Sequence, residues 1–243
     1  MAEKIALITG GATGIGAAVA TMAAQHGCKV AICDVNEAAG SALAEQLDGR
    51  FIFCDVTSLA SVSAAVSSCI EQMGVPDYAH LNAGIMTVPT GDPYLPIEDV
   101  PEAAYRRIVG VNLDGVFHGA KVLIPHMREA GGAITLTAST AGLTVVPVDP
   151  MYTATKYAVV GFGRAVAAAN AGSGLRVNVI CPGVTDTQIV PDEFKTPEFN
   201  MMPAKVIAAE VWDLLTNGPN GEIRVKVAAS VPAFAVEPAD LRN

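Results

Sequence analysis

A tyrosine and a lysine four residues apart are the first candidates for chemistry in this sequence. Tyr152 and Lys156 lie in a segment of helical periodicity, residues 151–170, so their spacing places both side chains on one helix face. A nearby ammonium stabilises a phenolate, and we therefore predict that the pKa of Tyr152 falls towards the working pH. Such a tyrosinate could take the hydroxyl proton of an alcohol as hydride leaves its carbon, and the phenol could return that proton in the reverse direction.

Two more polar residues are candidates for the same site. Ser139 follows the apolar run 134–137 and could donate a hydrogen bond to a substrate oxygen. Asn112 lies among three spaced glycines and, from its surroundings alone, would be an ordinary polar helix residue. Three histidines have no paired serine or cysteine, so a hydrolase triad is not supported: His80, His118 and His126.

A glycine-rich turn, TGGATGIG at residues 9–16, follows the first apolar run and leads into a helical segment. Glycines let backbone N–H groups approach a pyrophosphate, and the positive end of the following helix points at it. The turn could otherwise be a plain tight turn, but its position after a strand favours phosphate binding. The candidates for this role are Gly10, Thr13, Gly14, Ile15 and Gly16.

Acidic and small residues follow the next three apolar runs. Asp34 ends the second run, where its carboxylate could accept hydrogen bonds from both ribose hydroxyls and repel a 2′-phosphate. The alternative is a helix N-cap or turn residue, roles that aspartate also favours. Neither Thr13 nor Val35 adds a basic charge, which favours NAD over NADP. The later runs end in candidates for the adenine edge and for close approach of the cofactor: Asp55, Val56, Asn82, Ala83 and Gly84.

These residues require a parallel sheet to bring them together. Seven short apolar runs alternate with helical segments, at residues 5–9, 30–33, 51–54, 78–81, 134–137, 177–181 and 223–227. Runs that are apolar on both faces are typical of strands covered by helices on both sides. We predict an α/β fold with a doubly wound, Rossmann-type parallel sheet of seven strands, in a single domain over residues 1–243. Ligands of such sheets bind beyond the carboxyl ends of the strands.

Composition excludes several classes of protein. The chain is 51% hydrophobic with a mean hydropathy of +0.40, but its apolar runs are too short to span a membrane. Its start leaves no room for a signal peptide, so we expect a cytoplasmic location. Five scattered cysteines suggest neither disulfides nor a metal site. A net charge of -9 argues against nucleic acid and anionic membranes, leaving small molecules or copies of the same chain as partners.

Together the motifs resemble the full set of the short-chain dehydrogenase/reductase family, in order and over nearly the whole chain. They are TGxxxGIG at residues 9–16, NAG at 82–84, Asn112, Ser139, YxxxK at 152–156, and PG at 182–183 with Thr187. The resemblance implies an NAD-dependent oxidoreductase with Asn112, Ser139, Tyr152 and Lys156 as catalytic residues. It implies that Lys156 also binds the nicotinamide ribose, and that a helix kink at Asn112 frees a carbonyl for a water in a proton relay. It adds Pro182, Gly183, Val184 and Thr187 to the cofactor site, with Thr187 on the carboxamide.

Within the family, residues 152–183 and the ending NGEIRVKVAAS look similar to members like 15-hydroxyprostaglandin dehydrogenase. The chain departs from that enzyme at two places. It has Asp149 at the position where the resemblance implies a glutamine that donates to the substrate, and it continues after Val227 in an apolar tail. We therefore expect a secondary alcohol other than a prostaglandin, or the corresponding ketone. Two alternatives stay open: an NADPH-dependent 3-oxoacyl-type ketoreductase, which would need basic residues near Thr13 or Asp34, and an NAD-binding sensor without turnover.

The segment 184–205 is long for a connection between strand and helix, which is typical of a substrate lid. We expect its apolar residues, including Phe194 and Met202, to face the cleft and to select a hydrophobic or aromatic alcohol. The alternative is that this face packs on the body of the protein.

We also predict a homodimer or homotetramer, because residues 102–127 and 152–170 carry more apolar and small side chains than one sheet-facing stripe can bury. The side chains concerned are Val116, Phe117, Ala120, Val159, Phe162, Ala165 and Ala169. The resemblance implies that the two helices pair across a two-fold axis.

Overall fold

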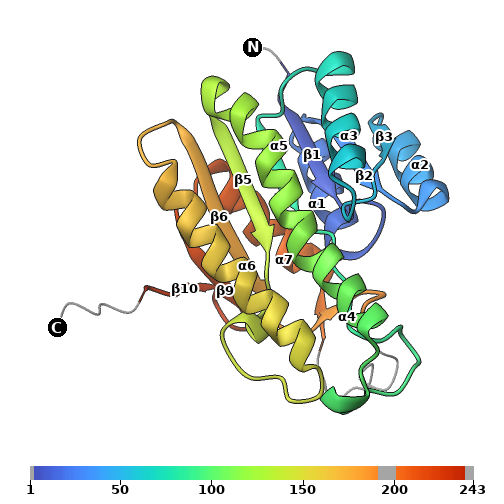
Figure 1. Cartoon of the computed structure of the whole chain (residues 1–243). Coiled ribbons are helices and arrows are strands. Elements are labelled where there is room, and N and C mark those ends of the chain that lie inside the picture. The colour runs from blue at the N-terminus through green and yellow to red at the C-terminus, as the bar shows by residue number, and fades with distance from the viewer. Residues whose placement is uncertain (1–2, 191–200, 239–243) are drawn as a thin grey trace.

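The computed structural model describes residues 3–190 and 201–238, and its centre is an eight-stranded sheet (Figure 1). The strand order is β10-β9-β6-β5-β4-β1-β2-β3. Seven strands are parallel: β1 (Ile5–Thr9), β2 (Lys29–Asp34), β3 (Arg50–Phe53), β4 (Tyr78–Leu81), β5 (Gly132–Thr137), β6 (Leu175–Pro182) and β9 (Ile223–Lys226). They correspond to the seven predicted runs, so the doubly wound parallel fold is confirmed.

The sheet has one edge strand that the sequence did not predict. β10 (Phe234–Ala235) pairs antiparallel with β9, and both of its side chains are exposed. A strand of two residues outside the core carries no apolar periodicity, which explains why it was missed. A separate small sheet pairs β7 (Thr185–Asp186) with β8 (Met202–Pro203).

Helices cover both faces of the main sheet. α3 (Leu59–Gln72), α5 (Gly115–Ala130) and α6 (Pro150–Ala169) pack on one face, and α1 (Gly14–Gln25), α2 (Glu37–Gln46) and α7 (Ala204–Thr216) on the other. α4 (Glu102–Val109) leads into α5 through a π-helical turn at Gly110–Asp114. Short 3₁₀ turns lie at Ile97–Asp99 and Thr140–Gly142. No helix in residues 3–190 and 201–238 is long and apolar enough to cross a membrane.

The order of strands reverses at β1, which lies between β2 and β4. The connections after β1 and β4 therefore leave the sheet in opposite directions and open a crevice at the carboxyl ends of the strands. α4 and the segments that follow β4, β5 and β6 gather at this end in Figure 1. The site residues predicted from the ends of separate strands are thus brought to one edge.

The glycine-rich turn makes a close contact that only glycine permits. A Cβ on Gly16 would lie 2.0 Å from the Gly10 carbonyl oxygen, and Gly10 itself has a φ of +60°. Any larger residue at Gly16 would push α1 away from β1. The start of α1 is thereby held directly over the end of the first strand.

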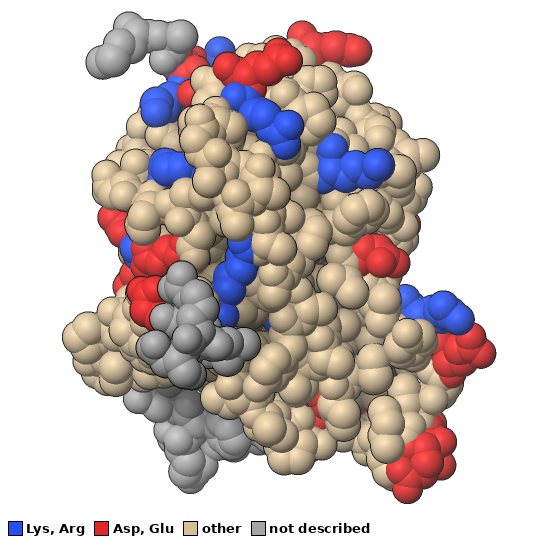
Figure 2. All heavy atoms as spheres, turned by 60° about the vertical axis from the view of Figure 1, so that its left-hand side comes forward, with Lys and Arg blue, Asp and Glu red and all other residues tan. Residues whose placement is uncertain are grey.

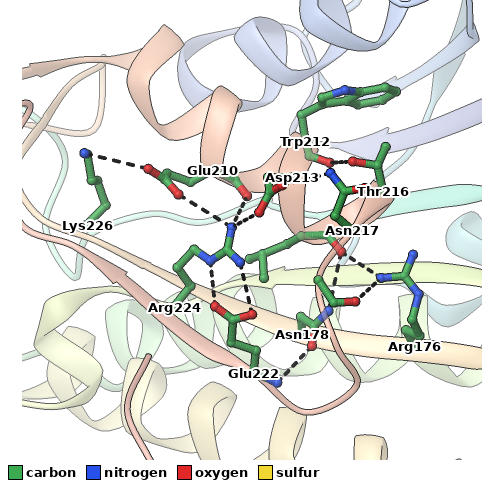
Figure 3. A network of polar contacts seen from close by, with 12 residues as sticks. Arg176, Asn178, Glu210, Trp212, Asp213, Thr216, Asn217, Glu222, Arg224 and Lys226 are labelled. Atoms are coloured by element: carbon green, nitrogen blue, oxygen red, sulfur yellow. Dashed lines mark hydrogen bonds and ion pairs between the residues drawn. The ribbon is translucent and has the colours of Figure 1, made fainter. Parts of the chain in front are cut away.

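An ion cluster fastens α7 to the far edge of the sheet, as Figure 3 shows. The Arg224 guanidinium of β9 contacts carboxylates of Glu222, Asp213 and Glu210, at 2.7, 2.6 and 3.6 Å. Arg176 on β6 donates to the carbonyl oxygens of Leu214, Leu215 and Gly218, where α7 ends. Those carbonyls lack partners within the helix, so the arginine serves as its cap.

The prediction that Met202 faces the cleft as part of a lid is wrong. Met202 is fully buried in the core beneath α7, and its N–H donates to the Val184 carbonyl at 2.9 Å. Its pairing in β8 turns the side chain into the body, so Met202 does not face the cleft. Phe194, Lys195 and their neighbours in residues 191–200 lie outside the described residues.

Four of the predicted interface residues pack against the core. Val116, Ala120 and Val159 are buried there and cannot contribute to an interface, and Phe162 is partly buried against the same core. The exposed face of α6 instead presents small and apolar side chains: Ala154, Tyr157, Gly161, Ala165, Ala168 and Ala169. Phe117 on α5 is also exposed, at 44%.

Candidate functional site

A cleft of about 810 Å³ lies at the carboxyl ends of the strands. It is lined by nearly all of the residues predicted from sequence: Gly10, Thr13, Gly14, Ile15, Asp34, Val35, Asp55, Val56, Asn82, Ala83, Gly84, Ser139, Tyr152, Lys156, Pro182, Gly183, Val184 and Thr187. Two predicted residues do not line it. Gly16 packs against the glycine-rich turn, and Asn112 lies behind the cleft wall, fully buried.

The first part of the cleft fits a dinucleotide. Thr13 precedes α1 without a side-chain cap, so no side chain occupies the N–H groups of the first helical turn. Asp34 at the end of β2 accepts from Ala12 N–H at 3.0 Å and from Asn36 N–H at 2.9 Å. These bonds fix the carboxylate beside the glycine-rich turn, where ribose hydroxyls would be bound. Uncapped N–H groups, glycines that leave room, and an adjacent carboxylate together suit a nicotinamide dinucleotide.

Asn82 joins three strands at the floor of the cleft. Its Nδ2 donates to the Gly10 carbonyl at 3.2 Å, and its Oδ1 accepts from Thr137 Oγ1 at 3.1 Å. Its backbone N–H donates to Thr9 Oγ1 at 3.0 Å. The asparagine thus fixes the glycine-rich turn relative to β4 and β5. Behind it, Thr137 also contacts the buried ring of His80, at 3.3 Å.

Tyr152 and Ser139 meet at the end of β5, but the pKa of the tyrosine does not fall as predicted. Burial raises the pKa of Tyr152 to about 12, which outweighs the lowering by its hydrogen bond with Ser139. The prediction assumed that the Lys156 charge would dominate. Loss of water around the phenol is the larger effect in the protein without ligands, because a buried phenolate is poorly solvated.

The position and burial of Lys156 explain why its charge does not lower the pKa of Tyr152. Its side chain is buried, its Nζ donates to the Thr137 carbonyl at 3.0 Å, and the Nζ lies 5.5 Å from the centre of the Tyr152 ring. Burial lowers the pKa of Lys156 to about 8, so part of the lysine population is uncharged near neutral pH. The described hydrogen bond of the Lys156 Nζ thus goes to the end of β5.

Asn112 lies in the π-helical turn between α4 and α5, at the position where the kink was predicted. Its Oδ1 accepts from Ile85 N–H at 2.8 Å, and its Nδ2 donates to the Ile85 carbonyl at 2.9 Å and to Thr155 Oγ1 at 3.2 Å. A Cβ on Gly84 would lie 3.3 Å from Lys156 Nζ and 3.5 Å from Asn112 Oδ1. The glycine therefore leaves room for both the lysine and the asparagine beside the chain at residue 84.

Thr187 and the residues after β6 close the cleft opposite the glycine-rich turn. A Cβ on Gly14 would lie 3.1 Å from Thr187 Cγ2, so the two segments approach across the cleft. Gly183 N–H donates to the Lys226 carbonyl at 2.8 Å, which fixes the chain as it leaves the sheet. The Gln188 carbonyl accepts from Thr90 Oγ1 at 2.9 Å.

Several cleft residues were missed from the sequence. They form an apolar wall beyond Tyr152 and Ser139: Ile85, Met86, Val88, Pro89, Tyr94, Val146 and Val148, with Ile189 and Val190 of the expected lid facing them. The apolar composition of residues 85–95 after NAG was a signal that could have found part of this wall. Arg107 also lines the cleft, and its Nη2 donates to the Thr87 carbonyl at 3.0 Å.

Comparisons with known proteins agree with this geometry. A family model described as short chain dehydrogenase matches residues 4–198. A mitochondrial borneol dehydrogenase of Lavandula x intermedia is 36% identical over 78% of this chain and 72% of its own. A trans-4-hydroxycyclohexanecarboxylate dehydrogenase of Sinomonas cyclohexanicum is 36% identical over 77% of this chain and 74% of its own.

Among solved structures, a 3-ketoacyl-(acyl-carrier-protein) reductase from Brucella melitensis complexed with NADH superposes with a TM-score of 0.84. It is 28% identical and covers 93% of this chain and 96% of its own. The similarity therefore extends over the whole fold, including the part that forms the cleft.

Proposed function

The chain belongs to the short chain dehydrogenase family, whose members bind a nicotinamide cofactor, and we propose that it is an NAD-dependent dehydrogenase of secondary alcohols. The observation that carries the proposal is the convergence of Tyr152, Ser139 and Lys156 at the inner end of a cleft that fits a dinucleotide. The reverse reaction, reduction of the corresponding ketone, uses the same groups.

Each of these residues has a part in the reaction. The bound nicotinamide would supply the hydride acceptor. Ser139 donates a hydrogen bond to the substrate oxygen, and the phenolate of Tyr152 takes the hydroxyl proton as the carbonyl forms. Lys156 would hold the nicotinamide ribose. The proton that Tyr152 has taken would then leave the phenol towards Lys156 and the π-helical turn at Asn112, which restores the phenolate. The closeness of Gly84, Lys156 and Asn112 supports this route.

The preference for NAD over NADP rests on Asp34. Its carboxylate would lie beside the ribose and repel a 2′-phosphate dianion. The cleft is lined by only two cations in the described part of the chain, Lys156 and Arg107, and both contact other groups. An NADPH-dependent 3-oxoacyl-type ketoreductase would need a cation near Asp34, so this alternative is the weaker one. The 3-ketoacyl-(acyl-carrier-protein) reductase from Brucella melitensis is itself complexed with NADH. A sensor without turnover is disfavoured by the complete set of catalytic side chains.

The substrate that suits this cleft is a medium-sized, largely hydrophobic secondary alcohol. Apolar side chains line the end of the cleft beyond Tyr152, and they would be covered from water by a ring or hydrocarbon skeleton. Relatives named for borneol and a hydroxycyclohexane acid act on alcohols of this shape. A prostaglandin is not favoured, because Asp149 is buried and not available to the substrate. The proposed lid keeps the part of the segment that directly follows β6: Ile189 and Val190 line the cleft, whereas Met202 and the start of α7 belong to the body of the protein.

We further propose a homodimer or homotetramer formed through α5 and α6. Figure 2 shows a face whose charged side chains lie mostly in its upper half and along its sides, with one basic side chain near the middle and a largely uncharged area in the lower middle. A cytoplasmic location is also part of the proposal, supported by five cysteines that are all free and buried.

A direct assay tests the proposed reaction. The protein is incubated with a panel of secondary alcohols, and the absorbance of reduced cofactor is followed with NAD and NADP side by side. We expect kcat/KM for NAD to exceed that for NADP by about 10²-fold, a difference of about 2.7 kcal/mol. Asp34→Ser should narrow this ratio, whereas Asp92→Asn on an exposed loop should not change it. Equal values for the two cofactors would contradict the NAD assignment, and no turnover with any alcohol would contradict the reaction.

A further inference from the structure

Asp149 is a buried carboxylate beside the proposed acid/base, and its contacts reach two separate segments. Its side chain is 1% exposed. Oδ1 accepts from Tyr152 N–H at 2.9 Å and from Thr87 Oγ1 at 2.5 Å, and Oδ2 accepts from Thr87 N–H at 3.0 Å. No lysine or arginine in the described ranges forms an ion pair with it. The charge is therefore balanced by three hydrogen bonds alone.

Helix capping accounts for only one of these bonds. Asp149 is the N-cap of α6 and satisfies the Tyr152 N–H, a task that serine or asparagine performs without burying a charge. The two bonds to Thr87 have no part in capping. Burial of a carboxylate costs free energy unless hydrogen bonds stabilise the charge, and here the Thr87 backbone and hydroxyl supply two of them.

Thr87 belongs to the segment 85–90, which forms one wall of the cleft. The segment is held at three places: Asn112 binds both polar atoms of the Ile85 backbone, Asp149 binds Thr87, and Thr90 binds the Gln188 carbonyl. Arg107 binds the Thr87 carbonyl from α4. Two members of this set connect the wall to α6, the helix that carries Tyr152: Asn112 through Thr155, and Asp149 at the first turn, directly on the Tyr152 N–H.

We propose that Asp149 is a positioning residue for Tyr152: its carboxylate joins the cleft wall at Thr87 to the first turn of α6 and so fixes where the phenol meets the substrate. This inference rests on the proposed function, because it assigns a role within the same site. A displacement of about 1 Å between a substrate and its proton acceptor can reduce turnover by about 10²-fold. A rigid connection at this point would prevent such a displacement.

The charge of Asp149 has a second consequence. Burial is the largest cause of the high pKa of Tyr152, and the Asp149 charge raises the pKa further, as do Tyr94 and Cys181. Lys156 on α6 and Arg107 on α4 are the cations near this group, and both are engaged by backbone carbonyls. Removal of the Asp149 charge should therefore let Tyr152 ionise at lower pH.

Three variants separate positioning from simple stability. Asp149→Asn removes the charge and leaves one amide donor facing Thr87 N–H. Thr87→Val removes the hydroxyl bond and keeps the charge, and Thr87→Ser keeps both. We expect Asp149→Asn and Thr87→Val to lower kcat for the best alcohol by about tenfold or more, because the phenol is no longer held where it exchanges the proton with the substrate. The Kd for NAD should stay within about twofold, and Thr87→Ser should keep kcat near the wild-type value.

The pH readout is independent of turnover. Spectrophotometric titration of tyrosinate, with Tyr152→Phe as the reference, follows the ionisation of Tyr152 without substrate. We expect ionisation at lower pH in Asp149→Asn and no such displacement in Thr87→Val or in the exposed control Asp92→Asn. An unchanged kcat in both Asp149→Asn and Thr87→Val, or an unchanged titration of Tyr152 in Asp149→Asn, would overturn the proposal. If the wild type turned over no alcohol, the proposed function would fail while this titration would still test Asp149.

Discussion

Opposing effects act on the phenol of Tyr152. Its own burial and the charge of Asp149 raise the pKa, while the hydroxyl of Ser139 lowers it. Spacing on a helix predicted the right neighbours but could not predict the desolvation, which depends on how completely the neighbouring strands and loops exclude water. Tyr152 is therefore a weaker acid in the cleft than a tyrosine in water.

Replacement of the phenol oxygen tests the role of this residue. Tyr152→Phe should reduce kcat for alcohol oxidation by about 10²- to 10⁴-fold, because only the proton-transfer group is lost. The Kd for NAD, measured by calorimetry, should change less than about twofold. Retention of more than about half of the activity would remove Tyr152 from its proposed role.

The pKa of Tyr152 also determines the pH dependence. A group whose pKa is about 12 is almost entirely protonated at neutral pH, so its base form increases about tenfold per pH unit below that value. The rate of alcohol oxidation should therefore rise from pH 6 to about 10 without a plateau. Lys156, with a pKa of about 8, loses its charge in the same range, so the slope should be below one. Ketone reduction requires the phenol and should not show this rise; a flat oxidation profile would contradict the assignment.

At the scale of elements, α7 is held to the sheet by charge as well as by its apolar face. Arg224 and Glu222 are only 13% and 12% exposed, so removal of the guanidinium leaves poorly solvated carboxylates without a partner. This cluster lies in the half of the sheet away from β1 and holds β9, whose Lys226 carbonyl accepts from Gly183 N–H beside the cleft.

A matched pair of variants measures this contribution. Arg224→Met should lower the free energy of unfolding by about 2 kcal/mol, less than for a fully buried pair because Asp213 is 48% exposed. Arg106→Met breaks an exposed pair with Glu102 and should cost less than about 0.5 kcal/mol. Thermal unfolding should place Tm of the first variant about 4 to 8 °C lower. Equal Tm values for the two variants would show that the cluster adds no stability.

At the scale of the whole molecule, one helix face has no cover within the described chain. α6 has 20 residues but only two charged ones, and its exposed positions are alanines, a glycine and Tyr157. A flat face of this kind lets a second helix approach closely. This exposed face belongs to α6, the helix that carries Tyr152 and Lys156. An assembly through it would therefore support α6 on its outer side.

A charge placed on this face should prevent assembly. We expect wild-type protein to scatter light as a dimer or tetramer at micromolar concentration, and Ala165→Glu to shift the mass towards the monomer. Ala42→Glu on the exposed side of α2 is the matched control and should leave the mass unchanged. A monomeric wild type, or a variant with unchanged mass, would contradict the proposed interface.

The sequence by itself determined the parallel sheet and the ends of its strands. Apolar runs, glycines and polar residues after each run depend on local chemistry, so Asp34, Asn82, Ser139 and the pair Tyr152 and Lys156 could be located without coordinates. Parallel strands bring their carboxyl ends to one edge, which explains why residues far apart in the chain were correctly expected in one cleft.

Only the tertiary structure decided what depends on burial and on contacts between distant segments. Met202 has the apolar side chain of a lid residue, yet pairing with β7 turns it into the core. The bonds between Asp149 and Thr87 join positions 62 residues apart, which no local pattern reveals. The pKa of Tyr152 follows from the water excluded around it, a property of packing that neither residue type nor spacing contains.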